Sequence, residues 1–251
     1  MTAKKFLFYL LAALLGGCIP VISLHPLYND QDLVFEEKLL GVWVDDPNSP
    51  EVTWHFSRHM ESEKAYELIF CDKEGNKGLF IAHLVKLHDK PFLDVYPGEL
   101  PWEPQDPNKV QWPYNAYFLV PAHTFIKIDF LGSLLSLQNQ PQAGQDLDTD
   151  TLPKVSKHYD YALKMRLTDD DAFEKLIEQD PNAVKHESLK DRGIVLTAST
   201  KELQKFVLKY ADDNKLFAEQ KLLIRKKDKS PQQPTEQDPN RPNSSDPNKA
   251  G

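Results

Sequence analysis

Hydrophobic and polar residues alternate along much of this 251-residue chain. From Val52 to Ser57 the alternation is unbroken, which places Val52, Trp54 and Phe56 on one face of a strand and the polar residues on the other. Similar apolar or alternating runs cover residues 40–44, 66–72, 78–87, 92–96, 124–131, 134–138, 159–166 and 193–197. About nine short strands at hairpin spacing predict an antiparallel meander barrel, with a β-sandwich as the alternative. Residues 221–225 are a candidate for a last edge strand.

Helical periodicity occurs in two segments. Over residues 168–180, Thr168 precedes three acidic residues that complement the dipole of a helix ending before Pro181. Over residues 200–217, Ser199 and Glu202 have the spacing of a capping box. An apolar stripe follows it at Leu203, Phe206, Val207 and Tyr210. The fold class is therefore mainly β with two or three helices (α+β), the helices packing on the outside of the barrel.

The two ends of the chain differ from this pattern. Residues 226–251 contain five prolines and almost no apolar side chain, so we predict a disordered polar tail. Residues 19–32 contain Pro20, Pro26 and a polar stretch, which is typical of a linker. We therefore divide the chain into a leading segment over 1–17, a tether over 18–32, a single domain over 33–225 and the tail.

The leading segment has the features of a secretion signal. Lys4 and Lys5 precede an apolar run that ends at Leu15, and Gly16, Gly17 and Cys18 follow. A membrane-spanning signal anchor is the alternative, but the run is shorter than the roughly 20 residues that a spanning helix needs. Extending it would include two glycines and Pro20, which disfavour a helix.

The stretch Leu14-Leu15-Gly16-Gly17-Cys18 resembles the lipobox of bacterial lipoproteins. The resemblance implies cleavage before Cys18, acylation of that cysteine, for example with palmitate, and attachment to a membrane. Ile19 follows the cysteine where an aspartate would resemble an inner-membrane retention signal. The expected location is therefore the bacterial cell envelope, with the outer membrane favoured over the inner.

Charge and cysteine content narrow the range of partners. The net charge is −8, and loss of Lys4 and Lys5 with the signal makes it more negative still. A nucleic-acid partner is not expected, because binding phosphates needs a basic surface. With Cys18 acylated, Cys71 has no partner for an intramolecular disulfide, and we interpret it as a buried, inert thiol.

Two further resemblances concern the fold. Residues 23–28, 32–35, 196–200 and 202–204 look like segments of a group of uncharacterised bacterial lipoproteins, which has no assigned activity. Gly41-Val42-Trp43 resembles the Gly-x-Trp signature of lipocalins, whose tryptophan closes one end of an eight-stranded barrel. The second lipocalin motif is at best degenerate here, as Tyr159-Asp160-Tyr161, and its arginine has no assignable counterpart. The resemblance implies a lipocalin-like barrel.

Catalytic chemistry is not apparent in the sequence. Phosphate-binding loops, nucleophile elbows, His-Glu-x-x-His and paired Cys-x-x-Cys motifs do not occur, so neither an enzyme nor a cofactor is expected. His55 and His59 are about 13 Å apart along a strand, too far for one metal ion. His83 and His123 belong to different strands and remain candidates for a metal site. Asp94 and Asp129 lie in apolar strands, where we expect both to face water.

Aromatic residues supply the candidate ligand contacts. Inward-facing side chains would line the barrel, and the proline-rich connection over residues 97–115 would cover its mouth. The ligand-contact candidates are Trp54, Phe56, Tyr66, Trp102, Trp112, Tyr159 and Tyr161. The first hypothesis is a lipid-anchored envelope protein that binds a small apolar molecule in this barrel. The alternative is a structural or interaction lipoprotein whose barrel is filled and holds no ligand.

Overall fold

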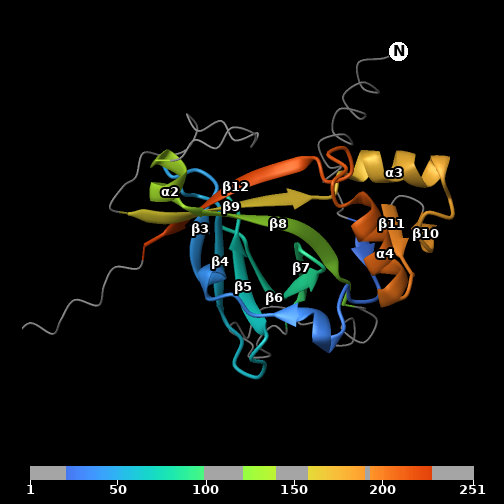
Figure 1. The fold of residues 1–251 in the computed structure, drawn as a ribbon, viewed down its shortest axis with the longest axis horizontal. Helices are drawn as coiled ribbons and strands as arrows, with labels where there is room; N and C mark the ends of the chain where they lie inside the picture. Colours follow the sequence, from blue (N-terminus) through green and yellow to red (C-terminus); the bar gives the residue numbers. More distant parts are fainter. Residues whose placement is uncertain (1–20, 99–120, 140–157, 190–192, 228–251) are drawn as a thin grey trace, which may run out of the picture.

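The computed structural model describes residues 21–98, 121–139, 158–189 and 193–227 (Figure 1). These residues form twelve strands and three α-helices, with two 3-10 turns over Asp30–Asp32 and Glu37–Leu39. The strands are β1 (Ile22–Ser23), β2 (Leu33–Val34), β3 (Gly41–Val44), β4 (Thr53–Arg58), β5 (Ala65–Cys71), β6 (Lys77–Leu87), β7 (Lys90–Pro97), β8 (Thr124–Ser133), β9 (Tyr159–Leu167), β10 (His186–Leu189), β11 (Gly193–Leu196) and β12 (Glu219–Lys226). The helices are α2 (Leu134–Asn139), α3 (Asp170–Gln179) and α4 (Thr200–Tyr210).

Eight of the strands close into an antiparallel barrel. Strands β3 to β9 pair in sequence order, and β12 pairs with both β9 and β3, which completes the circle. The predicted meander barrel is confirmed, and the sandwich alternative is not. The segment proposed as a last edge strand is instead β12, the strand that closes the barrel. Strand β2 adds to β6 outside the circle.

Alternation along the strands separates an apolar interior from the outer surface. Paired residues such as Trp43 and Trp54 lie opposite each other and face the same side, which here is the interior. The hairpin between β5 and β6 has Gly75 at φ +84, and the Asp72 carboxylate accepts a hydrogen bond from the backbone N–H of Asn76. This is the turn that the glycine predicted, because only glycine adopts positive φ without strain.

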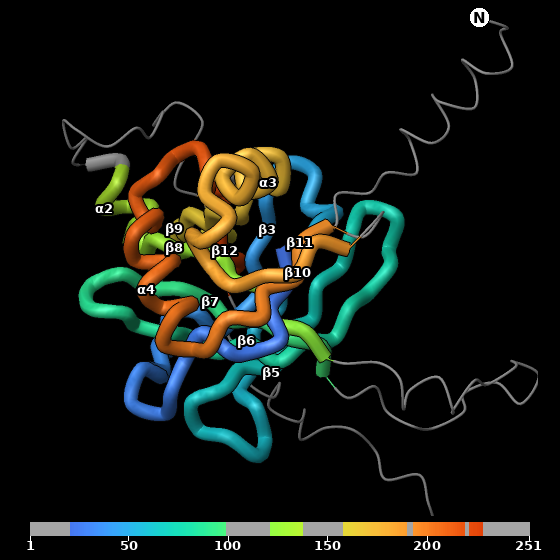
Figure 2. Tube along the Cα trace, turned by 90° about the vertical axis from the view of Figure 1, so that its right-hand side faces the viewer, coloured from blue at the N-terminus to red at the C-terminus, as the bar shows by residue number. Residues whose placement is uncertain are grey.

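A second unit is inserted between β9 and β12. It contains α3, β10, β11 and α4. The N-terminal strand β1 completes its three-stranded sheet, in the order β1-β11-β10, and is parallel to β11. Both views place this insert beside the barrel (Figures 1 and 2). Its apolar side chains, including Phe173 and Phe206, share one core with outward-facing residues of β6, β7 and β8, namely Val85, Phe92 and Phe125. The helices thus pack on the outside of the barrel, as their apolar stripes predict.

The N-terminal segment joins the insert to the barrel. Leu27 is fully buried in the shared core, and its backbone N–H donates to the Asp94 carboxylate of β7 at 2.6 Å. On the other side, Gln204 of α4 donates to the Leu27 carbonyl at 2.9 Å. From Val21 onward, the residues predicted as a tether are therefore part of the folded domain. The sequence did not indicate that these residues are buried, because the side chains that cover them come from distant parts of the chain.

A buried lysine makes the second connection between the two units. Lys127 of β8 is 4% exposed and donates from Nζ to the Ala211 carbonyl, at the C-terminal end of α4, at 2.8 Å. Burial lowers the pKa of Lys127, and the neighbouring Asp212 carboxylate, 3.4 Å away, opposes that effect. A cation at the end of a helix also interacts favourably with the helix dipole. Lys127 therefore fixes the orientation of α4 against the barrel.

Three predicted elements differ from the structure. Residues 134–138 form helix α2 rather than a strand, because Ser133 Oγ accepts from the backbone N–H of Ser136 and Leu134 packs against Ile224 and Ala162. Helix α4 ends at Tyr210 rather than at residue 217, since the Asp213 carboxylate organises the following turn. The N-cap of α3 is Asp169 rather than Thr168. Among the described helices, none is long and apolar enough to cross a membrane.

Burial of the N-terminal segment leads to a stability prediction. Leu27→Ala should lower the free energy of unfolding by about 2–5 kcal/mol, because it opens a cavity in the core shared by barrel and insert. Leu24 is 43% exposed, and Leu24→Ala is the matched control, with an expected change within about 0.5 kcal/mol. Urea unfolding measures both. Equal, small effects would show that the segment is not packed in solution.

Candidate functional site

Large side chains fill the barrel interior, where a barrel of this size can hold a small ligand. Trp43, Phe56, Tyr66 and Leu68 are each at most 1% exposed. The same cluster contains further buried residues from six barrel strands and the chain before β3: Leu39, Trp54, Ala82, Leu84, Leu93, Val95, Ile126, Ile128, Leu163, Met165 and Leu223. A side chain buried to this degree borders no space that a water molecule can enter. Of the predicted ligand contacts, Trp54, Phe56 and Tyr66 therefore lie inside, packed against other side chains.

Polar atoms of the interior aromatics are mostly bonded within the protein. The Tyr66 hydroxyl accepts from the backbone N–H of Glu36 at 2.6 Å and donates to the carbonyl of the same residue at 3.2 Å. Burial raises the pKa of Tyr66 to about 12. Trp43 Nε1 donates to the Leu39 carbonyl at 2.8 Å. These groups are committed to the chain just before β3, so they are not free to bind a ligand.

Arg225 closes one end of the barrel. Its guanidinium forms two hydrogen bonds to the Asp160 carboxylate, at 2.9 and 2.8 Å, and packs over the rings of Tyr161 and Trp43. It also donates to the Lys38 carbonyl at 3.1 Å. This is an arginine beside the Gly-x-Trp tryptophan, for which the sequence alone offered no candidate. The sequence pattern could have indicated this arginine, because Arg225 lies two residues after Leu223. Alternation along a strand then places both side chains on the inner face.

Of the remaining predicted contacts, Tyr161 packs against the interior cluster at the end that Arg225 closes. Tyr159 packs against α2 outside the barrel and donates to the Pro47 carbonyl at 3.1 Å. Trp102 and Trp112 lie outside the described residues. Among the described interior residues, Trp54 Nε1 is a polar group that is buried without a hydrogen-bond partner. Trp54 packs on the partly buried Phe70, at a ring distance of 4.7 Å.

A second candidate site lies on the outer face of the barrel, where β6, β7 and β8 meet the N-terminal segment. His83 and Asp94 are opposite each other on β6 and β7, and His123 lies just before β8. His123 Nδ1 donates to Asp94 Oδ1 at 2.6 Å, and Asp94 Oδ2 accepts from Leu27. Asp94 is fully buried, which corrects the expectation that it faces water. Residues 92–96 are apolar on both faces, and that was a sign of a strand covered on both sides.

Aromatic rings surround the two histidines. Tyr96 lies 5.9 Å from the His83 ring and 5.1 Å from the His123 ring, between centroids. Tyr28 contacts His83 at 4.5 Å. Burial raises the pKa of both tyrosines and lowers the pKa of His83, with Asp94 opposing the shift of His83. His83 is therefore held as a neutral imidazole, while Asp94 orients the ring of His123.

The metal-site expectation for His83 and His123 finds no complete ligand set. Among the described residues, no group of three or more His, Cys, Asp or Glu side chains has the geometry to hold a metal ion. Asp94 uses both carboxylate oxygens in the bonds to His123 and Leu27, which leaves His83 Nδ1 buried and without a partner. Asp94 and its neighbours therefore hold the N-terminal segment against the barrel.

Asp129, the other aspartate expected to face water, is partly exposed and binds Arg166 at 2.8 Å.

Of the two cysteines, Cys18 lies outside the described residues, as does most of the predicted tail. Cys71 is an unpaired, half-buried thiol on β5. Comparison with protein-family models, with curated protein sequences and with solved structures gave no match to this chain.

The burial of His83 predicts a pH dependence of stability. In the unfolded chain His83 takes up a proton below its ordinary pKa of 6.5, whereas the folded protein resists protonation until a lower pH. The unfolded state then binds more protons, so the free energy of unfolding falls as the pH drops through this window. His83→Phe keeps an aromatic ring against Tyr28 and removes this titration. Its free energy of unfolding should fall less between neutral pH and about one unit below 6.5.

Urea unfolding at several pH values measures this difference. His55 is exposed on β4, and His55→Phe is the control that should keep the pH dependence of the parent protein. If the His83→Phe protein has the same pH dependence as the parent, buried His83 is not the group that lowers stability at acid pH.

Proposed function

We propose that this protein is a lipid-anchored component of the bacterial cell envelope that acts through its surface, with the barrel as a rigid, filled scaffold. The observation that carries the proposal is the packing of the barrel interior, where Trp43, Phe56 and Tyr66 are at most 1% exposed. An eight-stranded barrel has room either for packed side chains or for one small ligand. Here packed side chains take that room, which leaves the outer surface to make functional contacts.

Three pockets lined by described residues support the same view. One lies between α3 and the β10–β11 hairpin, another beside α4, and a third, of about 10 Å³, between barrel and insert. None of these three is lined by an inward-facing residue of the barrel. The insert therefore offers the recesses that a partner would contact.

One feature favours a second candidate, the binding of a small ligand at one end of the barrel. Trp54 Nε1 is a buried donor without an acceptor, and an unsatisfied buried polar group costs about 1–3 kcal/mol. A ligand oxygen that accepted from Trp54 would remove this cost. Partly buried Val52, Phe70 and Phe80 would provide apolar contacts around it. Such a ligand would occupy the mouth rather than the interior.

Binding of a fluorescent fatty acid tests the filled barrel. We expect no saturable binding by the soluble Cys18→Ser protein, because the described interior side chains are packed against one another. Phe56→Ala, which opens an apolar cavity in the interior, is the positive control, since engineered apolar cavities stay dry and bind small apolar molecules. For this variant the probe is benzene or xenon. Saturable one-to-one binding of the fatty acid by Cys18→Ser itself would favour the carrier.

The proposed anchor rests on Cys18 and is tested separately. In a bacterial host, the full chain should label with radioactive palmitate and sediment with membranes. Cys18→Ser should lose the label, because the acyl chains attach to that sulfur, while Cys71→Ser should keep it. If the full chain with Cys18 intact sediments with membranes but takes up no label, the result would contradict lipidation at Cys18. It would point to the leading segment itself as the anchor.

A further inference from the structure

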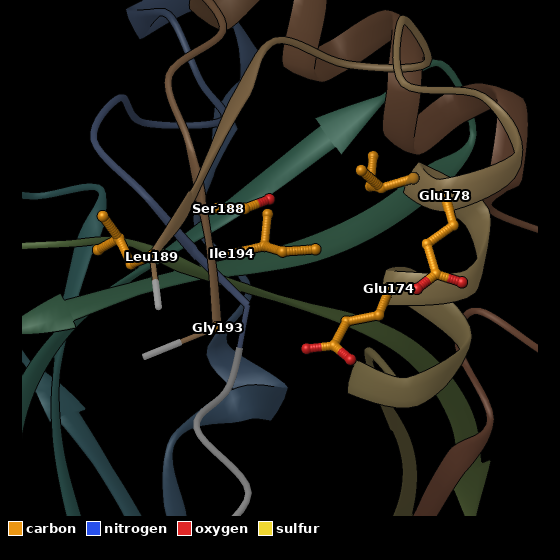
Figure 3. A pocket seen from close by; sticks show the side chains of 7 residues that line it. Glu174, Glu178, Ser188, Leu189, Gly193 and Ile194 are labelled. Atoms are coloured by element: carbon orange, nitrogen blue, oxygen red, sulfur yellow. The ribbon is translucent and has the colours of Figure 1, made fainter. Parts of the chain in front are cut away.

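An open groove lies on the insert, on the side away from the barrel core. It has a volume of about 390 Å³ and runs between helix α3 and the β10–β11 hairpin. Ile177 of α3 and Ile194 of β11 form its apolar floor, at 6% and 8% exposure. Figure 3 shows the side chains of Glu174 and Glu178 on the helix side of the groove, and Ser188, Leu189 and Ile194 on the hairpin side.

Strand β10 provides an open sheet edge beside this groove. In the order β1-β11-β10, β10 is terminal, and within the described chain no strand pairs with its outer side. Ser188 is opposite Ile194 in register, so the groove wall and the open edge belong to the same hairpin. Unpaired N–H and C=O groups along an edge strand are a template for an added strand.

Charge indicates what kind of segment would fit. Glu174 and Glu178 are one helical turn apart and exposed, and neither has an ion pair or side-chain hydrogen bond in the described structure. Two like charges at this spacing disfavour a helix when nothing compensates them. Leu189, at the end of β10, is 46% exposed at the same groove. The rim thus combines uncompensated negative charge with an apolar surface.

We propose that this groove binds an extended, basic segment of a partner protein, which adds to β10 as a fourth strand of the small sheet. Backbone hydrogen bonds to the β10 edge would hold the segment, and lysine or arginine side chains on its α3 side would pair with Glu174 and Glu178. The inference rests on the proposed surface role. No groove residue lines the barrel, so a ligand found inside the barrel would overturn that role and leave the groove measurement standing.

Fluorescence anisotropy with a short labelled peptide, in which lysine alternates with threonine, tests the proposal on the Cys18→Ser chain. We expect saturable one-to-one binding. Glu174→Lys with Glu178→Lys should weaken it roughly tenfold or more, because attraction becomes repulsion. The corresponding glutamine variants should show a smaller loss in the same direction. Two further peptides carry N-methyl groups on alternate residues, one on the odd positions and one on the even positions. One of the two should lose binding, since an added strand donates backbone N–H groups to its neighbour from alternate residues only.

A control with the same change in charge separates the groove from general attraction to an acidic protein. Glu61 and Glu63 are exposed in the turn between β4 and β5, and their double lysine variant should bind within about twofold of the parent. Equal losses in both double variants, or unchanged binding of both N-methylated peptides, would overturn the proposal. A dimer of the parent that Glu174→Lys with Glu178→Lys dissociates would assign the groove to a second copy instead.

Discussion

Closing eight antiparallel strands into a barrel fixes the space inside it, and the side chains that fill this space determine what the barrel can do. In this protein Trp43, Phe56 and Tyr66 help to fill the interior, and Arg225 closes one end by binding Asp160 and the chain before β3. A fully buried apolar side chain such as Phe or Leu contributes about 1.5–3 kcal/mol. The interior therefore contributes to stability through residues that a carrier of the same size would have to give up.

The insert depends on the barrel in a different way. Its helices and small sheet share a core with the outer faces of β6, β7 and β8, and two buried ionisable groups fix its position. Asp94 binds the N-terminal segment and Lys127 binds the end of α4. Such groups are stable in an apolar environment only when they are bonded, so both sites also specify one relative arrangement of the two units.

Local patterns predicted most of the fold. Alternation located the barrel strands, and capping signals located the N-terminal ends of α3 and α4, although α4 ends earlier than predicted. Interactions between distant residues were not predictable in this way. Asp94 was expected to face water, because its partners Leu27 and His123 come from other parts of the chain. Strand β10 was missed because its residues, His186 to Leu189, lack the alternation of a half-buried strand. The lipocalin resemblance led to the barrel but not to Arg225, whose role depends on how the strands close.

Native mass spectrometry of the Cys18→Ser protein, purified from its own cell envelope, tests the central claim most directly. The folded protein and the denatured protein should have the same mass, that of the polypeptide, because packed side chains leave no place for a ligand in the barrel. A mass excess in the folded protein that disappears on denaturation would contradict a protein that acts through its surface alone, and its loss in Trp54→Phe would assign the ligand to the mouth of the barrel.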